Sequence, residues 1–271
     1  MSIVITGASG QLGRATASYV LERTSDVVLV TRSPESVTDL GGEARFGDFD
    51  DPASLTRAFE GAERVLIIST DAVGARLEGQ RNAAAAAAAA GARQIAYTSI
   101  PNPSHNNPAG VVPDHRETEE AIRATGVPFT FLRNSIYAEI MAMGAEVARA
   151  TGKLVTNAGD GRSSYVLRDD CARAAAAVLT TDGHENRIYD ITGPKGLSVE
   201  EVAALYGEGI EVVQLDDDAW IATMSEHMPE AGARLFSSFG TATRLGYSAP
   251  VSTAVKDLTG RDPRPAAEAV G

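Results

Sequence analysis

Three glycines near the start of the chain have the spacing of a phosphate-binding turn. They lie in the stretch Thr6-Gly7-Ala8-Ser9-Gly10-Gln11-Leu12-Gly13. Glycine permits a tight turn at Gly7, lets the backbone approach a pyrophosphate at Gly10, and allows a helix to pack closely on a strand at Gly13. The N–H groups at the start of the following helix can hold the phosphates. This stretch therefore predicts a dinucleotide site built from residues 7–13.

The context of these glycines separates the prediction from an ordinary strand-turn-helix, which is the alternative. An apolar strand precedes them at 3–6, a helix follows at 12–23, and a second strand follows at 27–31. A glycine pattern has little weight alone, but this strand, turn and helix order is the arrangement that a dinucleotide site requires.

The end of the second strand indicates which dinucleotide binds. It runs Val30-Thr31-Arg32-Ser33 and has no acidic residue, whereas sites selective for NAD place an Asp or Glu there to bind the ribose hydroxyls. Arg32 can instead pair with a 2′-phosphate, so we expect NADP(H); the alternative is a solvated arginine. Asp48, after the third strand, either meets the adenine amino group or is a turn residue.

Short β-branched apolar runs alternate with helical segments along the first half of the chain. The predicted strands are 3–6, 27–31, 45–46, 65–69, 94–99 and 129–133. The predicted helices are 12–23, 52–59, 78–90, which includes an alanine-rich run, and 114–124. Buried parallel strands read as continuous apolar runs, and their crossovers need helices. The sequence therefore predicts an α/β protein with a doubly wound parallel sheet of the Rossmann type.

After Asn134 this alternation loosens. The predicted elements are helices 138–151 and 169–180 and strands 153–155, 165–166 and 188–191. We expect a single domain over 1–271, in which segments at about 135–165 and 195–250 form a smaller substrate-facing part interleaved with the core. The tail 261–271, rich in proline and alanine, is expected to fray.

Composition and charge argue against several classes of protein. The chain has 44% hydrophobic residues and a net charge of −12, so we expect a globular protein with neither nucleic acid nor an anionic membrane as partner. The single cysteine, Cys171, rules out an intramolecular disulfide and a cysteine-based metal site, and no metal is expected. The apolar strand begins at Ile3, which leaves no room for a signal peptide and predicts a cytoplasmic protein.

Several motifs in chain order carry a family resemblance. They are the glycine stretch 6–13, Thr31-Arg32-Ser33-Pro34, Gly47-Asp48, Ile68-Ser69-Thr70, Ala96-Tyr97-Thr98-Ser99, Thr118-Glu119 and Leu132-Arg133-Asn134-Ser135-Ile136-Tyr137. With them the chain resembles the NmrA-like atypical short-chain dehydrogenases, and among these the type-2 NAD(P)H:quinone oxidoreductases and triphenylmethane reductases. The resemblance covers residues 1–200 well and the rest loosely. It implies cofactor contacts around the nicotinamide half for Ser69, Thr70, Ser99, Asn134 and Arg168, with Tyr137 beside them.

The chain departs from ordinary short-chain dehydrogenases in their catalytic motif. These enzymes use Tyr-x-x-x-Lys, in which the tyrosine donates a proton and the lysine lowers its pKa. The lysines of this chain are Lys153, Lys195 and Lys256, and none lies four residues after a tyrosine. The usual alcohol-carbonyl chemistry therefore lacks its acid.

His115 occupies the position that matches the lysine of that motif. In one interpretation Asp114 caps the helix, Glu117 completes a capping box, and His115 is an exposed first-turn residue. In the other, His115 faces the nicotinamide ribose or donates a proton, because a histidine pKa suits proton exchange near neutrality.

A cofactor site without a tyrosine acid suits acceptors that need a hydride more than a proton. We therefore expect NADPH-dependent hydride transfer to a small quinone-like or other electrophilic acceptor, with the oxyanion protonated by water or His115. Tyr137 either lines the acceptor slot or is a plain core residue. The alternatives are a redox sensor that binds NADP(H) without turnover, and a reductase or isomerase of a biosynthetic ketone or alkene. The sequence leaves open a homodimer.

Overall fold

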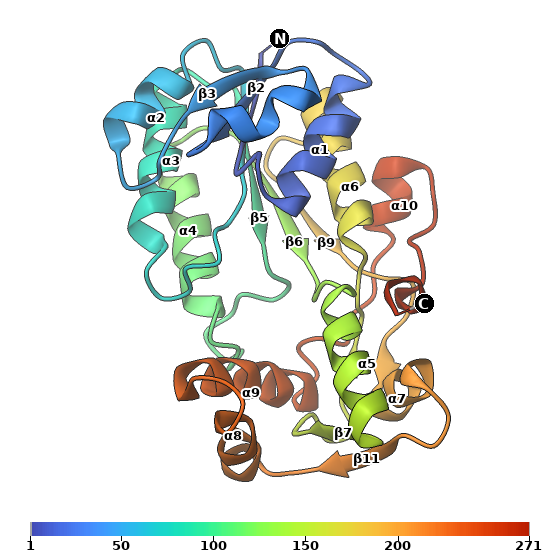
Figure 1. Cartoon of the computed structure of the whole chain (residues 1–271). Helices are drawn as coiled ribbons and strands as arrows, with labels where there is room; N and C mark the ends of the chain where they lie inside the picture. Colours follow the sequence, from blue (N-terminus) through green and yellow to red (C-terminus); the bar gives the residue numbers. More distant parts are fainter. Residues whose placement is uncertain (1, 271) are drawn as a thin grey trace.

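Seven parallel strands within residues 2–270, the part of the chain that this computed structural model describes, form the central sheet (Figure 1). In spatial order they are β3 (Glu43–Phe46), β2 (Val27–Thr31), β1 (Ile3–Thr6), β4 (Arg64–Ile67), β5 (Gln94–Ser99), β6 (Phe129–Asn134) and β9 (Arg187–Ile191). The chain goes from β1 to β2 and β3 and then returns to β4 on the other side of β1. Ligands of doubly wound sheets bind beyond the carboxyl ends of the strands at such a reversal.

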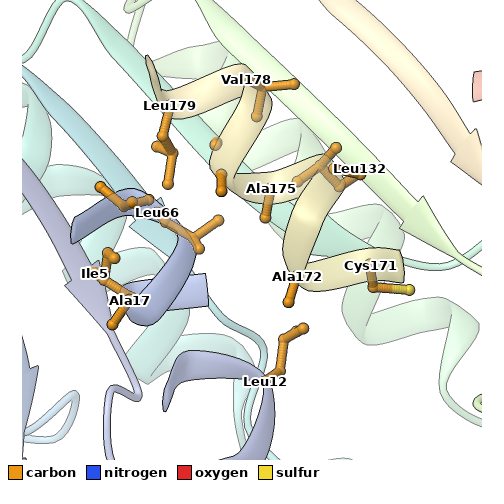
Figure 2. Packing of buried hydrophobic residues seen from close by; sticks show 14 of the residues in the cluster. Ile5, Leu12, Ala17, Leu66, Leu132, Cys171, Ala172, Ala175, Val178 and Leu179 are labelled. Carbon is orange, nitrogen blue, oxygen red and sulfur yellow. The ribbon is translucent and has the colours of Figure 1, made fainter. Parts of the chain in front are cut away.

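Helices cover both faces of this sheet. One face carries α1 (Gln11–Leu21), α6 (Arg168–Thr180) and α10 (Ala254–Thr259), and the other carries α2 (Pro52–Ala58), α3 (Leu77–Ala89) and α4 (Val112–Ala124). Figure 2 shows the core on the first face, where Leu12 of α1 faces Ala172 and Ala175 of α6. The predicted doubly wound α/β fold is therefore confirmed. Within residues 2–270, no helix is both long and apolar enough to cross a bilayer.

The alanine-rich run lies in α3, as predicted. Ala83, Ala84 and Ala87 are buried against the sheet. Alanine has the highest helix propensity, and its small side chain lets α3 lie close to β4 and β5. This run is therefore a packed crossover helix.

A second group of elements lies beyond the carboxyl ends of the strands, in the lower half of Figure 1. Its members are α5 (Ile140–Thr151), β7 (Lys153–Thr156), β8 (Arg162–Ser163), β10 (Leu197–Ser198), α7 (Val199–Tyr206), β11 (Glu211–Gln214), α8 (Asp217–Ser225) and α9 (Glu230–Arg244). β11 pairs with β7 in parallel and β10 with β8 antiparallel. These elements come from the segments at 135–165 and 195–250, whose substrate-facing role stays a prediction.

Two local predictions are wrong. Residues 165–166 form no strand, because Val166 makes only an isolated bridge to Tyr137 before α6 begins. The described part of the tail, residues 261–270, does not fray: Ala266 and Val270 are buried against α5 and α7, and the N–H of Arg264 donates to Asp170 at 2.8 Å. Two apolar side chains and a backbone hydrogen bond are enough to hold it in place. Residue 271 lies outside the described residues.

Candidate functional site

The glycine turn between β1 and α1 has the geometry that its spacing predicts. Gly7 has a φ of +60°, a left-handed conformation that favours glycine. The N–H of Gly10 donates to the carbonyl of Gly7 at 2.9 Å and closes the turn. A Cβ on Gly13 would lie 2.8 Å from the carbonyl carbon of Gly7 and 2.9 Å from Cα of Ala8. Only glycine therefore lets α1 pack this closely on the turn.

The N-terminus of α1 is free to bind an anion. Gly10 is its N-cap, no side chain caps the helix, and its first turn has no acidic residue. The first N–H groups of a helix have no intrahelical partner, so those of Gln11 and Leu12 are free to donate. A Cβ on Gly10 would meet only the oxygen of Gly7, at 3.3 Å. This backbone therefore fits a phosphate group.

The turn is tied to β2, the strand that carries Arg32 at its end. Ser9 Oγ lies 2.8 Å from Thr31 Oγ1, and the N–H of Ala8 donates to the carbonyl of Val30 at 3.2 Å. Arg32 is exposed and makes no ion pair or hydrogen bond with another residue in the range 2–270. Its guanidinium group is thus free for a ligand phosphate near the turn.

Asp48 shapes the turn after β3. Its carboxylate accepts the N–H of Asp50 at 3.1 Å, and its own N–H donates to Ser54 Oγ at 2.9 Å. Such local hydrogen bonds are typical of an aspartate in a turn. Contact between Asp48 and the adenine stays a prediction.

The ends of β4 and β5 carry the next three predicted residues. The N–H of Ser69 donates to Thr98 Oγ1 at 2.9 Å, and the carbonyl of Thr70 accepts from Arg76 at 2.6 Å. Ser99 instead turns toward α4, where its hydroxyl donates to Glu119 at 2.7 Å. Ser69 and Thr70 therefore lie together at the carboxyl edge, while the hydroxyl of Ser99 is already engaged by α4.

Asn134, Tyr137 and Arg168 form a cluster after β6. Nδ2 of Asn134 donates to the Tyr137 hydroxyl at 3.2 Å, and the Arg168 guanidinium lies 5.0 Å from the centre of the Tyr137 ring. Burial raises the pKa of Tyr137, so its phenol is a poor acid at neutrality. Oδ1 of Asn134 is buried and has no partner in the described residues. An amide-bearing ligand such as a nicotinamide would give this oxygen the donor that it lacks.

His115 is not the exposed first-turn residue of one interpretation. Helix α4 begins at Val112, and the predicted cap Asp114 instead accepts from Gly74 N–H at 2.8 Å and from Arg76 Nε at 3.0 Å. The His115 side chain is only 7% exposed and points at the sheet, with Nδ1 2.8 Å from the Tyr97 hydroxyl. The capping box with Glu117 is absent because the helix starts two residues earlier than predicted.

Burial also changes the chemistry available to His115. Its pKa is lowered well below the usual value, first by burial and then by the positive charge of Arg76. This lowered pKa disfavours proton exchange near neutrality, and the role of His115 in the site stays a prediction. A neutral imidazole can still donate one hydrogen bond and accept another.

Sequence reasoning gave no role to the partners of His115. The Tyr97 hydroxyl lies 2.8 Å from the Gln80 side-chain amide, and the Thr118 hydroxyl lies at the same distance from it. One signal for Gln80 was present in the sequence: it lies three, four and seven residues before Ala83, Ala84 and Ala87, on the buried face of the same helix. A polar residue on such a face needs a partner.

The Thr118-Glu119 and Leu132-Arg133 motifs have a structural explanation. Arg133 Nε and one of its terminal nitrogens donate to the two oxygens of Glu119 at 2.9 and 2.8 Å. Glu119 is buried and also accepts from Ser99. This bidentate pair joins β6 to α4, so these motif residues hold the site's framework together.

Comparisons with known proteins show the family of the chain. The model of a family described as NAD(P)H-binding matches residues 7–182. Quinone oxidoreductase 2 of Escherichia coli is 37% identical over 74% of this chain and 72% of its own length. A (4-alkanoyl-5-oxo-2,5-dihydrofuran-3-yl)methyl phosphate reductase of Streptomyces griseus is 32% identical over 97% of this chain and 94% of its own length.

Solved structures show the same likeness over nearly the whole chain. An E. coli NADPH-dependent quinone oxidoreductase in complex with NADPH superposes with a TM-score of 0.93 at 32% identity, covering 98% of this chain and 97% of that one. A Citrobacter triphenylmethane reductase in complex with NADP(H) superposes with a TM-score of 0.91 at 31% identity, covering 100% and 99%. The family resemblance drawn from the motifs is confirmed, and the chain belongs to the NAD(P)H-binding family of NmrA-like oxidoreductases.

Proposed function

We propose that the protein is an NADPH-dependent reductase of quinone-like or other electrophilic small molecules. The observation that carries the proposal is a glycine turn that fits a dinucleotide, in a chain that has no acidic group at the position of the usual catalytic tyrosine. Val111 stands four residues before His115, where ordinary short-chain dehydrogenases have their catalytic tyrosine. His115 is neutral, and the nearby Tyr137 has a raised pKa.

The residues of the turn and of β2 would hold the cofactor. Backbone N–H groups at the start of α1 would bind the pyrophosphate, and Arg32 would bind the 2′-phosphate. Asn134 Oδ1 would accept from the carboxamide, and Ser69 and Thr70 would border the nicotinamide half. When bound, NADPH supplies the hydride. The chain's own part is to orient the acceptor and stabilise the charge that develops on it.

An electron-poor acceptor fits a site in which the cofactor supplies the hydride and the chain orients the acceptor. A quinone accepts a hydride readily and becomes an oxyanion that water can protonate, so no strong acid is required. The neutral imidazole of His115 can stabilise that oxyanion by a hydrogen bond. The names of the relatives support this class of acceptor, since they include a quinone oxidoreductase, a triphenylmethane reductase and an NAD(P)H azoreductase.

Reduction of an unsaturated lactone is the second candidate. It is favoured by the S. griseus relative, which covers nearly the full chain and is named for a 5-oxo-2,5-dihydrofuran substrate. A ring of this kind is also electrophilic and needs no tyrosine acid to accept a hydride.

The test is NADPH consumption against a panel of benzoquinones, naphthoquinones, cationic dyes and butenolides. The absorbance of the purified protein is checked for flavin, which the proposal does not require. We expect turnover on a quinone, and His115→Ala to lower it by no more than about 10²-fold, the lower end of general acid catalysis. His227→Ala, at an exposed loop position, is the control. Tight NADPH binding with no turnover on any acceptor would favour the sensor alternative instead.

A further inference from the structure

A buried polar network lies between α3, α4 and β5, behind the predicted site. Its members are Gln80 of α3, Tyr97 of β5, and His115 and Thr118 of α4. Gln80, Tyr97 and Thr118 are fully buried, and His115 is nearly so. Because these side chains are buried, each hydrogen of the network must be donated to an acceptor within the network.

If Oε1 of Gln80 faces the network, the network has more short donor–acceptor contacts than hydrogens to occupy them. The Thr118 hydroxyl then lies 2.8 Å from Oε1 and 2.7 Å from the carbonyl oxygen of Asp114. Both are acceptors, and a hydroxyl has one hydrogen, so one of these contacts would hold no hydrogen. In addition, Nε2 of Gln80 is buried without a partner.

Turning the Gln80 amide by 180° resolves both problems. Nε2 then donates one hydrogen to Thr118 and one to Tyr97, and Thr118 donates to the carbonyl of Asp114. The Tyr97 hydroxyl is left with His115 Nδ1, at 2.8 Å, as the acceptor of its hydrogen. One carbonyl oxygen, Oε1, stays unpaired, which is a less severe defect than a buried unpaired N–H group. Amide orientation is assigned from the hydrogen-bond network in this way.

We propose that Gln80 and Tyr97 are positioning residues that hold His115 as the tautomer with its proton on Nε2. Nδ1 must accept from Tyr97, so the single proton of the neutral ring is placed on the other nitrogen. The catalytic role of this tautomer rests on the proposed function. Nε2 makes no hydrogen bond within residues 2–270, and it is not one of the fully buried atoms that lack a partner. In the proposed reaction, His115 then offers the acceptor oxygen a fixed N–H donor.

The residues around His115 favour a role as a hydrogen-bond donor over a role as a general acid. Arg76 lies close enough to disfavour a second positive charge, and it is itself engaged by Asp114 and by the carbonyl of Thr70. Those contacts join α4 to the loop after β4. His115 stands in the first turn of α4, just after the segment that leaves the carboxyl end of β5.

The tautomer can be observed directly by ¹⁵N NMR of histidine-labelled protein, with His115 assigned by the loss of its signals in His115→Gln. We expect wild type to show a protonated Nε2 and an unprotonated, hydrogen-bonded Nδ1. A wild-type spectrum with the proton on Nδ1 would overturn the proposal, and this holds whether or not a Gln80 variant folds.

Gln80→Met tests whether Gln80 imposes the tautomer. Without its donor, the Tyr97 oxygen can accept from Nδ1, so both tautomers should appear and kcat should fall about two- to fivefold, in proportion to the competent fraction, with an unchanged Kd for NADPH. Gln94→Met is the matched control, because Gln94 is also buried but contacts Thr130 instead. A single Nε2 tautomer in Gln80→Met would refute the role of Gln80. A failed quinone assay leaves the NMR result intact and removes only the link to catalysis.

Discussion

At the scale of the residue, we propose that Arg32 sets the preference between the two cofactors. It stands exposed beside the glycine turn, and the strand that it ends has no acid to bind ribose hydroxyls. We predict that wild type binds NADPH more tightly than NADH and that Arg32→Ala removes most of the difference. A charge-assisted contact contributes about 1.5–3 kcal/mol, roughly 10- to 150-fold in Kd.

Fluorescence titration of both cofactors measures this preference. Arg57→Ala is the control, because Arg57 is equally exposed but lies on α2, away from the turn. Equal affinities of wild type for the two cofactors would show that Arg32 is a solvated arginine.

His115 also predicts how stability depends on pH. Because its pKa is lowered in the folded protein, the unfolded chain takes up a proton below about pH 6.5 while the folded one does not. Stability is therefore lost as pH falls from 6.5 toward 5, by up to about 1.4 kcal/mol per pH unit from this residue. His115→Gln should make the acid side of the stability curve shallower.

Urea unfolding of wild type and His115→Gln between pH 5 and 8 measures that slope, with His227→Gln as an exposed control. His184, whose pKa burial also lowers, acts in the same direction and stays in both proteins. Parallel curves for wild type and His115→Gln would mean that the imidazole is protonated in the folded state.

Residues that act through the backbone were the easiest to predict from the sequence. Gly7 and Gly13 have conformations or contacts that only glycine tolerates, and their spacing makes this readable. His115 was harder, because its position on α4 could be counted but its burial against Tyr97 could not. That burial depends on where two helices and a strand meet, which no local pattern records.

At the scale of elements, α1 depends on two glycines for different reasons. A Cβ at Gly10 meets only one oxygen at 3.3 Å, whereas a Cβ at Gly13 overlaps the backbone of the turn. We predict that Gly10→Val stays folded but loses NADPH binding, since its side chain occupies the space of the pyrophosphate. Gly13→Ala should lose about 1–3 kcal/mol of stability, as overpacked sites do.

Circular dichroism melts and cofactor titrations separate the two effects. Gly232→Ala, in helix α9, controls for the entropy of replacing a glycine, because its φ is not positive and its Cβ would meet only Sδ of Met228, at 3.8 Å. If Gly10→Val still bound NADPH normally, the phosphate would have to bind elsewhere.

The strands and helices of the sheet were predicted closely, whereas beyond it only α5 and β7 were. Strands 3–6, 27–31 and 94–99 match the structure at both ends, because buried parallel strands are continuous apolar runs. Helices α7, α8 and α9 had no individual prediction. In α8 no residue is buried, so it has no apolar face from which a periodic pattern could arise.

At the scale of the whole molecule, the C-terminal tail joins the two parts of the chain. Arg264 contacts Asp169 and Asp170 of α6, on the sheet, while Val270 packs among α5 and α7. Arg149 of α5 also donates to the carbonyl of Val270 at 3.2 Å. The tail thus fixes α5 and α7, which come from the predicted substrate-facing segments, relative to the cofactor-binding sheet.

Val270→Asp tests that link. Burying a valine contributes about 1.5–3 kcal/mol, and each kcal/mol lost lowers Tm by roughly 2–4 °C in a chain of this size. Because the glycine turn and Arg32 lie on the sheet, we expect an unchanged Kd for NADPH but a raised KM for the acceptor. Ala267→Asp, exposed three residues earlier, should change none of these. A variant that melts early yet keeps its KM would show that α5 and α7 do not shape the acceptor slot.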